Sequence, residues 1–131
     1  MKCLDTDLLV AILRGRDKDA EEKMKQLDQE GRHGTTTVNA FELFFGAYRS
    51  DSRANNLDKM KALMGRLDIL PLDYSSSDKA GELLADLTED GKTIDFRDAL
   101  IAGISITNNL SLVTRNREHF SRIKGMKLEQ W

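Results

Sequence analysis

Three acidic residues in separate parts of the sequence have the chemistry of a functional site: Asp5, Glu42 and Asp98. Asp5 follows a short apolar run and is therefore expected at the end of a strand. Asp98 lies at the edge of the apolar stretch 93–106, where a 3.6-residue repeat places it on one face with Ile101. Such a carboxylate needs a hydrogen bond, a cation or a metal, because desolvating it alone costs several kcal/mol.

A divalent metal ion is the partner that the chemistry of these side chains favours. Carboxylates gathered within ~4 Å of one another repel by a few kcal/mol per pair at an effective dielectric of about 20. A divalent cation removes that repulsion. The sequence has one cysteine and two histidines, without a paired-histidine motif, so Mg²⁺ or Mn²⁺ bound by oxygen ligands is expected rather than zinc.

Each of these acids also has a purely structural alternative. Asp5 and Asp7 are suited to capping the helix that follows them, with Thr6 or Asp7 as the expected cap. Asn39 and Glu42 have the spacing of a capping box. An aspartate in the first turn of the helix that contains 98 favours that helix end through its charge. The residues alone leave both interpretations open.

The elements that must position these acids alternate between strands and helices. Apolar and β-branched runs predict strands at 2–5, 35–38, 68–72, 110–114 and 126–128. Helical spacing and turn residues predict helices over 8–13, 17–31, 40–48, 57–67, 78–89 and 93–107. This alternation predicts an α/β fold with a central, mostly parallel sheet, whose C-terminal strand edge holds Asp5 and the residues after Thr114.

Composition sets the broad class of the protein. A chain of 131 residues fits one domain, so residues 1–131 are expected to form a single unit. With 40% apolar and 32% charged residues, it is typical of a globular protein rather than a disordered one. The single Cys3 excludes a disulfide within one chain, and no run approaches a membrane span, so a cytoplasmic location is expected. A net charge of −2 argues against a broad basic face for nucleic acid.

Four short motifs occur in a set order along the chain: LDTD at 4–7, NAFEL at 39–43, DALIA at 98–102 and LVTRN at 112–116. Each is weak alone, but their order and spacing are more specific. Together they resemble a PIN-domain nuclease of the VapC toxin type. The resemblance covers nearly the whole chain and implies a three-layer α/β/α PIN-like domain.

The resemblance also implies a function. It implies an Mg²⁺- or Mn²⁺-dependent endoribonuclease that hydrolyses RNA phosphodiesters as the toxin of a type II toxin–antitoxin pair, with a VapB-like antitoxin as partner and a toxin homodimer. Asp5, Glu42 and Asp98 match the metal-binding acids of the family. A fourth acid is frequent after the strand that ends at Thr114, but this sequence has Asn116 there. Asn116 offers a carbonyl oxygen without a charge, and it completes the expected catalytic set.

Further residues are expected to support such a reaction. Thr6, Asp7 and Thr114 are candidates for orienting the metal ligands. Candidates for contacts to RNA phosphates are Arg14, Arg16, Arg49, Arg115 and Arg117. The amphipathic stretch 57–67 is expected in the core or against a partner.

Other functions remain as alternatives. Asp5-Thr6-Asp7 looks like the nucleophile motif of haloacid-dehalogenase-type phosphatases, but the chain offers no convincing match for the later lysine and acidic motif of that class. A PIN nuclease in RNA processing, without a toxin role, has the same motifs. The missing fourth acid favours a third alternative, a catalytically weak PIN-like binding module.

Overall fold

A computed structural model describes residues 1–131, and its centre is a sheet of five short strands. Each strand is parallel to its neighbours, so the sheet is parallel throughout rather than mostly. The order across the sheet is β3-β2-β1-β4-β5. The strands are β1 (Cys3–Leu4), β2 (Gly34–Thr36), β3 (Asp68–Leu70), β4 (Leu112–Thr114) and β5 (Leu128–Gln130).

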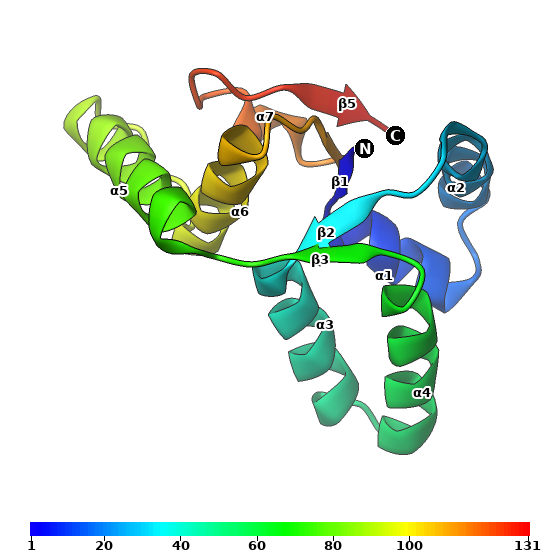
Figure 1. Cartoon of the computed structure of the whole chain (residues 1–131). Helices are drawn as coiled ribbons and strands as arrows, with labels where there is room; N and C mark the ends of the chain where they lie inside the picture. Colours follow the sequence, from blue (N-terminus) through cyan, green and yellow to red (C-terminus); the bar gives the residue numbers. More distant parts are fainter.

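Helices connect successive strands and cover both faces of the sheet (Figure 1). They are α1 (Thr6–Arg14), α2 (Lys18–Glu30), α3 (Thr37–Arg49), α4 (Arg53–Met64), α5 (Tyr74–Glu89), α6 (Phe96–Thr107) and α7 (Arg117–Phe120). Figure 1 shows α5 and α6 side by side, apart from the pair formed by α3 and α4. None of the helices combines the length and the apolar character that crossing a bilayer requires.

Two hydrophobic cores lie on opposite faces of the sheet because successive strand residues point to opposite sides. In β1, Cys3 belongs to one core and Leu4 to the other; in β4, Leu112 and Val113 divide in the same way. The core around Leu4 draws on α1 to α4, whereas the core around Cys3 draws on α5, α6 and α7. The predicted three-layer α/β/α fold is therefore confirmed.

Several element boundaries differ from those predicted. The second strand ends at Thr36 and α3 begins at Thr37, so Val38 and Asn39 are helical. The last strand begins at Leu128, and α5 and α4 each begin four residues earlier than predicted, at Tyr74 and Arg53. Helix α5 begins earlier because Asp73 and Ser76 form a capping box, which lies ahead of the first apolar residues of the helical pattern.

The order in which the chain adds strands to the sheet changes direction at β1. The chain moves from β1 to β2 and β3 on one side, and later returns to place β4 and β5 on the other. In parallel α/β sheets, ligands bind beyond the C-terminal strand ends at such a reversal. Asp5 follows β1 and Arg115 follows β4, so the predicted edge of the sheet carries both.

Candidate active site

Asp5 is a buried carboxylate held by neutral hydrogen-bond donors. It has 7% of its surface exposed, and its Oδ1 accepts hydrogen bonds from the backbone N–H of Thr6 at 2.9 Å and from Asn39 Nδ2 at 3.1 Å. Its Oδ2 accepts from Thr114 Oγ1 at 2.7 Å. Asp5 is itself the N-cap of α1, as its structural alternative predicts, whereas the expectation that Thr6 or Asp7 caps this helix is wrong.

The environment of Asp5 disfavours its charged form. Burial raises the pKa of this carboxyl to about 7, and repulsion from Asp7 and then Asp98 adds to the shift. Hydrogen bonds from Thr114 and from the Thr6 backbone act in the opposite direction. A cation placed beside Asp5 would therefore stabilise a charge that the surrounding protein does not neutralise.

Glu42 is joined to Asp5 through two polar side chains. Asn39 Nδ2 donates to Thr6 Oγ1 at 2.8 Å, and Thr6 Oγ1 donates to Glu42 Oε1 at 2.9 Å. The capping box at this helix forms between Thr36 and Asn39, so the alternative of an Asn39–Glu42 capping box is wrong. With α3 beginning at Thr37, Glu42 lies in its second turn, where its side chain reaches α1 instead of its own helix end.

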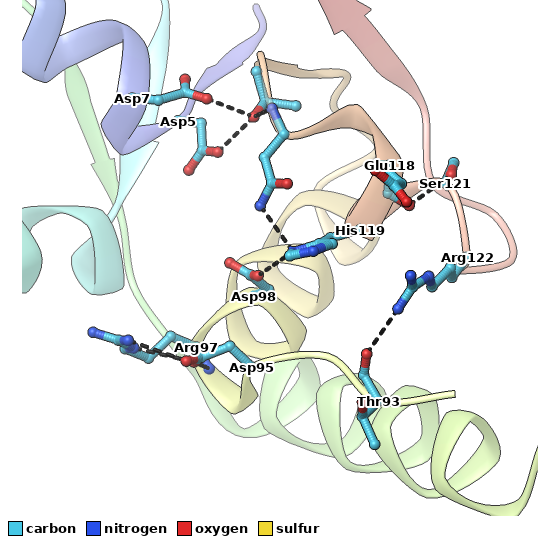
Figure 2. Close-up of polar contacts among 12 residues, drawn as sticks. Asp5, Asp7, Thr93, Asp95, Arg97, Asp98, Glu118, His119, Ser121 and Arg122 are labelled. Carbon is cyan, nitrogen blue, oxygen red and sulfur yellow. Dashed lines mark hydrogen bonds and ion pairs between the residues drawn. The ribbon is translucent and has the colours of Figure 1, made fainter. Parts of the chain in front are cut away.

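Asp98 approaches the same site from the first turn of α6. Burial raises its pKa, repulsion from Asp95 and Glu42 adds to this, and His119 and Arg97 partly oppose it. His119 Nδ1 lies 4.0 Å from Asp98 Oδ2 (Figure 2). Asp95 is the N-cap of α6 and accepts from the Arg97 backbone N–H at 2.8 Å, so capping is a function of Asp95 rather than of Asp98.

The three acids share one electrostatic environment. Asp98 raises the pKa of Asp5, and Glu42 raises that of Asp98, so their charges interact although Asp5 follows β1, Glu42 belongs to α3 and Asp98 belongs to α6. The structure contains no cluster of three or more His, Cys, Asp or Glu side chains arranged to hold a metal ion. The donor set itself fits a hard divalent cation, since it consists of carboxylate oxygens and Asp5 has no ion-pair partner.

Asp7 and Thr114 hold the residues around Asp5 in place through hydrogen bonds. Thr114 Oγ1 lies 3.1 Å from Asp7 Oδ2, and the same oxygen of Asp7 accepts from the Arg115 backbone N–H at 2.8 Å. Trp131 Nε1 donates to Asp7 Oδ1 at 3.0 Å. The loop after β4 is thus fixed to the first turn of α1, which holds Thr114 against Asp5.

Asn116 is linked to Asp5 through Thr114. Its backbone N–H donates to Thr114 Oγ1 at 3.0 Å, and its side-chain Nδ2 lies 3.3 Å from His119 Nδ1. A chain of polar contacts therefore runs from Asp5 through Thr114 and Asn116 to His119 and Asp98. The side-chain amide of Asn116 thus contacts His119 of the site and adds no charge to it.

The chain that carries these acids also matches a known family. A model of the PIN domain matches residues 2–126. The chain belongs to the PIN-domain family. The predicted resemblance to a PIN-domain nuclease is therefore confirmed over almost the whole sequence.

Individual relatives of this PIN domain are VapC proteins. A tRNA(fMet)-specific endonuclease VapC from Shigella flexneri is 27% identical over 128 residues, which span 98% of this chain and 96% of the relative. Ribonuclease VapC2 from Rickettsia felis is 28% identical with the same coverage. These matches confirm the VapC type, the class of ribonuclease that the sequence predicted.

Solved structures agree with this assignment. VapBC2 from Rickettsia felis bound to a promoter DNA fragment matches with a TM-score of 0.91 at 27% identity, covering 99% of this chain and 98% of that chain. DNA-bound VapBC from Salmonella typhimurium matches with a TM-score of 0.90 at 26% identity, covering 100% and 99%. Both are toxin–antitoxin complexes, and both share the fold of this PIN domain along its full length.

The arginines predicted to contact RNA are spread over the surface of the PIN domain. Arg14 and Arg16 line a cavity of about 560 Å³ that also contains Glu42. Arg49 lies over the Phe45 ring of α3 at 5.4 Å. Arg117 is exposed at the start of α7. None of the five is in an ion pair with Asp5, Glu42 or Asp98.

Arg115 has local partners of its own. It lies 3.5 Å over the Trp131 ring and 3.0 Å from Asp17. Arg115, Asp17 and Trp131 line a cavity together with Asp7 and other residues of α1. The contact of this arginine with RNA stays a prediction.

Four residues of the site were not predicted from the sequence: Asn39 as a partner of Asp5, and Arg97, His119 and Arg122 as neighbours of Asp98. The sequence predicts Asn39 as the first member of a capping box, but Thr36, three residues earlier, is the cap, and Asn39 is its partner. Arg97 directly precedes Asp98 in the sequence, so a cation next to an acid at a helix start was available as a signal. The positions of His119 and Arg122 depend on α7, which is too short to show a periodic pattern.

Proposed function

We propose that this protein is a metal-dependent endoribonuclease and the toxin of a type II toxin–antitoxin pair. The observation that carries the proposal is the buried Asp5 carboxylate at the β1–β4 reversal, electrostatically linked to Asp98 and Glu42 and without a cation of its own. A phosphatase with Asp5 as nucleophile is disfavoured, because the family match over residues 2–126 is to the PIN domain.

Asp5, Glu42 and Asp98 would hold Mg²⁺ or Mn²⁺, since hard divalent cations prefer carboxylate oxygens. A bound ion of this kind polarises phosphoryl oxygens and lowers the pKa of water, which suits phosphodiester hydrolysis. Thr114 and Asn39 fix the orientation of Asp5 through their hydrogen bonds. Thr6 does the same for Glu42, and Asp7 holds the Thr114 loop.

Cleavage of a defined RNA tests this proposal. Initiator tRNA is the first substrate to use, because a relative from Shigella flexneri is named as a tRNA(fMet)-specific endonuclease. With Mn²⁺ or Mg²⁺ we expect cuts that EDTA abolishes and that Asp98→Asn slows by about 100-fold or more, as loss of a charge at a metal site does. Asp86→Asn, an exposed acid of α5, is the matched control and should cleave normally. Equal cleavage by Asp98→Asn and the control would contradict the proposal.

We also propose a VapB-like antitoxin as partner and a toxin homodimer as the core of the complex. Support comes from the VapBC complexes that share this fold. The exposed aromatic side chains of α3, Phe41 and Phe45, are available for such contacts, with 55% and 54% of their surface exposed. Co-expression with the adjacent reading frame should give a stable complex; a protein that never binds that product and is harmless alone favours a nuclease outside toxin–antitoxin systems.

A catalytically weak binding module is the second candidate function, and Asn116 is the observation that favours it. Asn116 adds no charge beside Asp98, so a second ion would find fewer anionic ligands. Under this alternative the protein binds RNA but does not cut it.

We also propose that residues 1–131 form one domain, which the single sheet supports. We propose a cytoplasmic location as well, which the free, buried Cys3 supports.

A further inference from the structure

A polar cavity of about 660 Å³ opens beside Asp98 and Glu42. It is formed by the loop before α6, the first turn of α6, and α7 with the residues that flank it. Only one of its nine lining residues is hydrophobic, so it suits a charged or strongly polar ligand. Its cationic side chains are Arg97 and Arg122, and His119 also lines it.

Arg97 is held rigidly at one end of this cavity. Its Nε and Nη2 donate to the two oxygens of Asp95 at 3.1 and 3.0 Å, which fixes the plane of the guanidinium. The remaining nitrogen, Nη1, lies 4.0 Å from Glu42 Oε2. The side chain is 49% exposed, so the edge that does not face Asp95 remains accessible to a ligand.

Arg122 stands at the other end, and its charge is not neutralised. Its Nη1 donates to the backbone carbonyl of Thr93 at 3.0 Å, and no carboxylate lies within 4.0 Å of its guanidinium. Figure 2 shows Arg97 and Arg122 on opposite sides of Asp98, with His119 next to Asp98. Two anchored guanidinium groups thus flank the acid that is proposed to hold the metal ion.

We propose that Arg97 and Arg122 bind two phosphates of a single RNA strand, on either side of the phosphodiester that lies over Asp98. Guanidinium groups recognise phosphate oxygens through paired hydrogen bonds, and a fixed guanidinium loses little entropy on binding. The proposal rests on the proposed function, because it assigns the path of the substrate across the same site. It adds two residues that are not among the arginines predicted from the sequence to contact RNA.

The test compares each arginine with an arginine in a similar setting elsewhere on the surface. Arg66 pairs with both oxygens of Asp28, as Arg97 does with Asp95, and serves as its control. Arg53 donates to the backbone carbonyl of Tyr48 at 2.9 Å, as Arg122 does to that of Thr93, and serves as the second control. All four residues are changed to glutamine.

We expect Arg97→Gln and Arg122→Gln each to lower kcat/KM for tRNA cleavage by about tenfold or more, the loss typical of a charge-assisted hydrogen bond. Each should also make the slope of log(kcat/KM) against log[salt] shallower by roughly 0.7, since one contact to a single-stranded phosphate is lost. Arg66→Gln and Arg53→Gln should change neither value. The Mn²⁺ concentration that half-saturates the activity should stay unchanged in Arg122→Gln and in both controls, because a merely structural role would alter it. In Arg97→Gln this concentration should not rise, since the change removes a positive charge that lies 4.0 Å from Glu42 and opposes the pKa shift of Asp98.

Binding of a labelled single-stranded RNA, measured in the non-cleaving Asp5→Asn background, separates this inference from the proposed function. If the wild type cuts RNA while Arg97→Gln and Arg122→Gln behave like their controls, the arginine proposal is overturned and the nuclease stands. If no RNA is cut but binding weakens tenfold in both variants, the arginine proposal stands and the nuclease falls. Absence of both cleavage and binding overturns both.

Discussion

At the scale of single residues, Asp5 is surrounded by donors that carry no charge. Thr114, Asn39 and the Thr6 backbone hold its two oxygens, yet its pKa is still raised to about 7. Neutral hydrogen bonds therefore do not offset burial and the repulsion from neighbouring acids. The same repulsion reaches Asp98, so a site without a cation is electrostatically unfavourable in the folded protein.

This repulsion predicts opposite effects of Asp98→Asn with and without metal. In EDTA, the variant should have a free energy of unfolding about 1 kcal/mol higher than the wild type, because one of the interacting charges is gone. In saturating Mn²⁺, the wild type should gain about 1.4 kcal/mol for each tenfold excess over the dissociation constant, whereas the variant gains little. Urea unfolding in both buffers measures this, with Asp86→Asn as the control. A wild type that Mn²⁺ leaves unchanged would rule out a metal at this site.

At the scale of elements, the position of Asp98 depends on how closely α6 packs against α5. Gly103 of α6 makes this contact, since a Cβ added there would meet the Ser76 backbone oxygen at 2.7 Å and the Ala80 backbone nitrogen at 2.9 Å. These are backbone atoms and do not move out of the way as a flexible side chain would. Gly103 therefore sets the distance between the two helices and, through it, the position of the helix that carries Asp98.

Gly103→Ala is expected to destabilise the protein although alanine favours a helix. The intrinsic gain is at most about 1 kcal/mol, while inserting a methyl group into a closely packed contact typically costs about 1–3 kcal/mol. Gly81 of α5 provides the control, because a Cβ there has nothing within 4 Å. Gly81→Ala should raise the melting temperature and Gly103→Ala should lower it. Two shifts of the same sign would show that this packing is not as close as described.

At the scale of the whole molecule, a group of ion pairs joins the two ends of the chain. Lys2 Nζ lies 2.7 Å from Glu129 Oε1 and 2.9 Å from Glu30 Oε2, and Lys23 Nζ lies 2.7 Å from Glu129 Oε2. Burial acts to raise the pKa of Glu129, but hydrogen bonds from Lys2 and Lys23 hold it below its ordinary value. These pairs connect β5, which ends next to Trp131, to β1 and α2.

The direction of this pKa shift predicts a pH-dependent contribution to stability. The pKa of Glu129 is lower in the folded state than its ordinary value of 4.5. The ion pairs therefore stabilise the protein at pH values above 4.5 and lose that effect as the pH falls below 4.5. Glu129→Gln should therefore cost roughly 1 kcal/mol at pH 7 and progressively less as the pH falls below 4.5. Thermal unfolding across this range measures the difference. Glu82→Gln, which breaks an exposed pair with Lys79, should have little effect at either pH, and an equal pH dependence in both variants would contradict the prediction.

The sequence by itself determined the α/β class and most of the elements, and it singled out the three acids as the candidate site, because these follow from local signals. Alternation of strands and helices depends on residue periodicity, and Asp5, Glu42 and Asp98 stand in short motifs that can be read in order. Only the tertiary structure decided which neighbours these acids have. Asn39 and Asp5 lie 34 positions apart, and Thr114 and Asp5 lie 109 apart, so no local pattern encodes their hydrogen bonds. The same applies to Arg122, whose place beside Asp98 depends on how the residues after β4 fold back over α6.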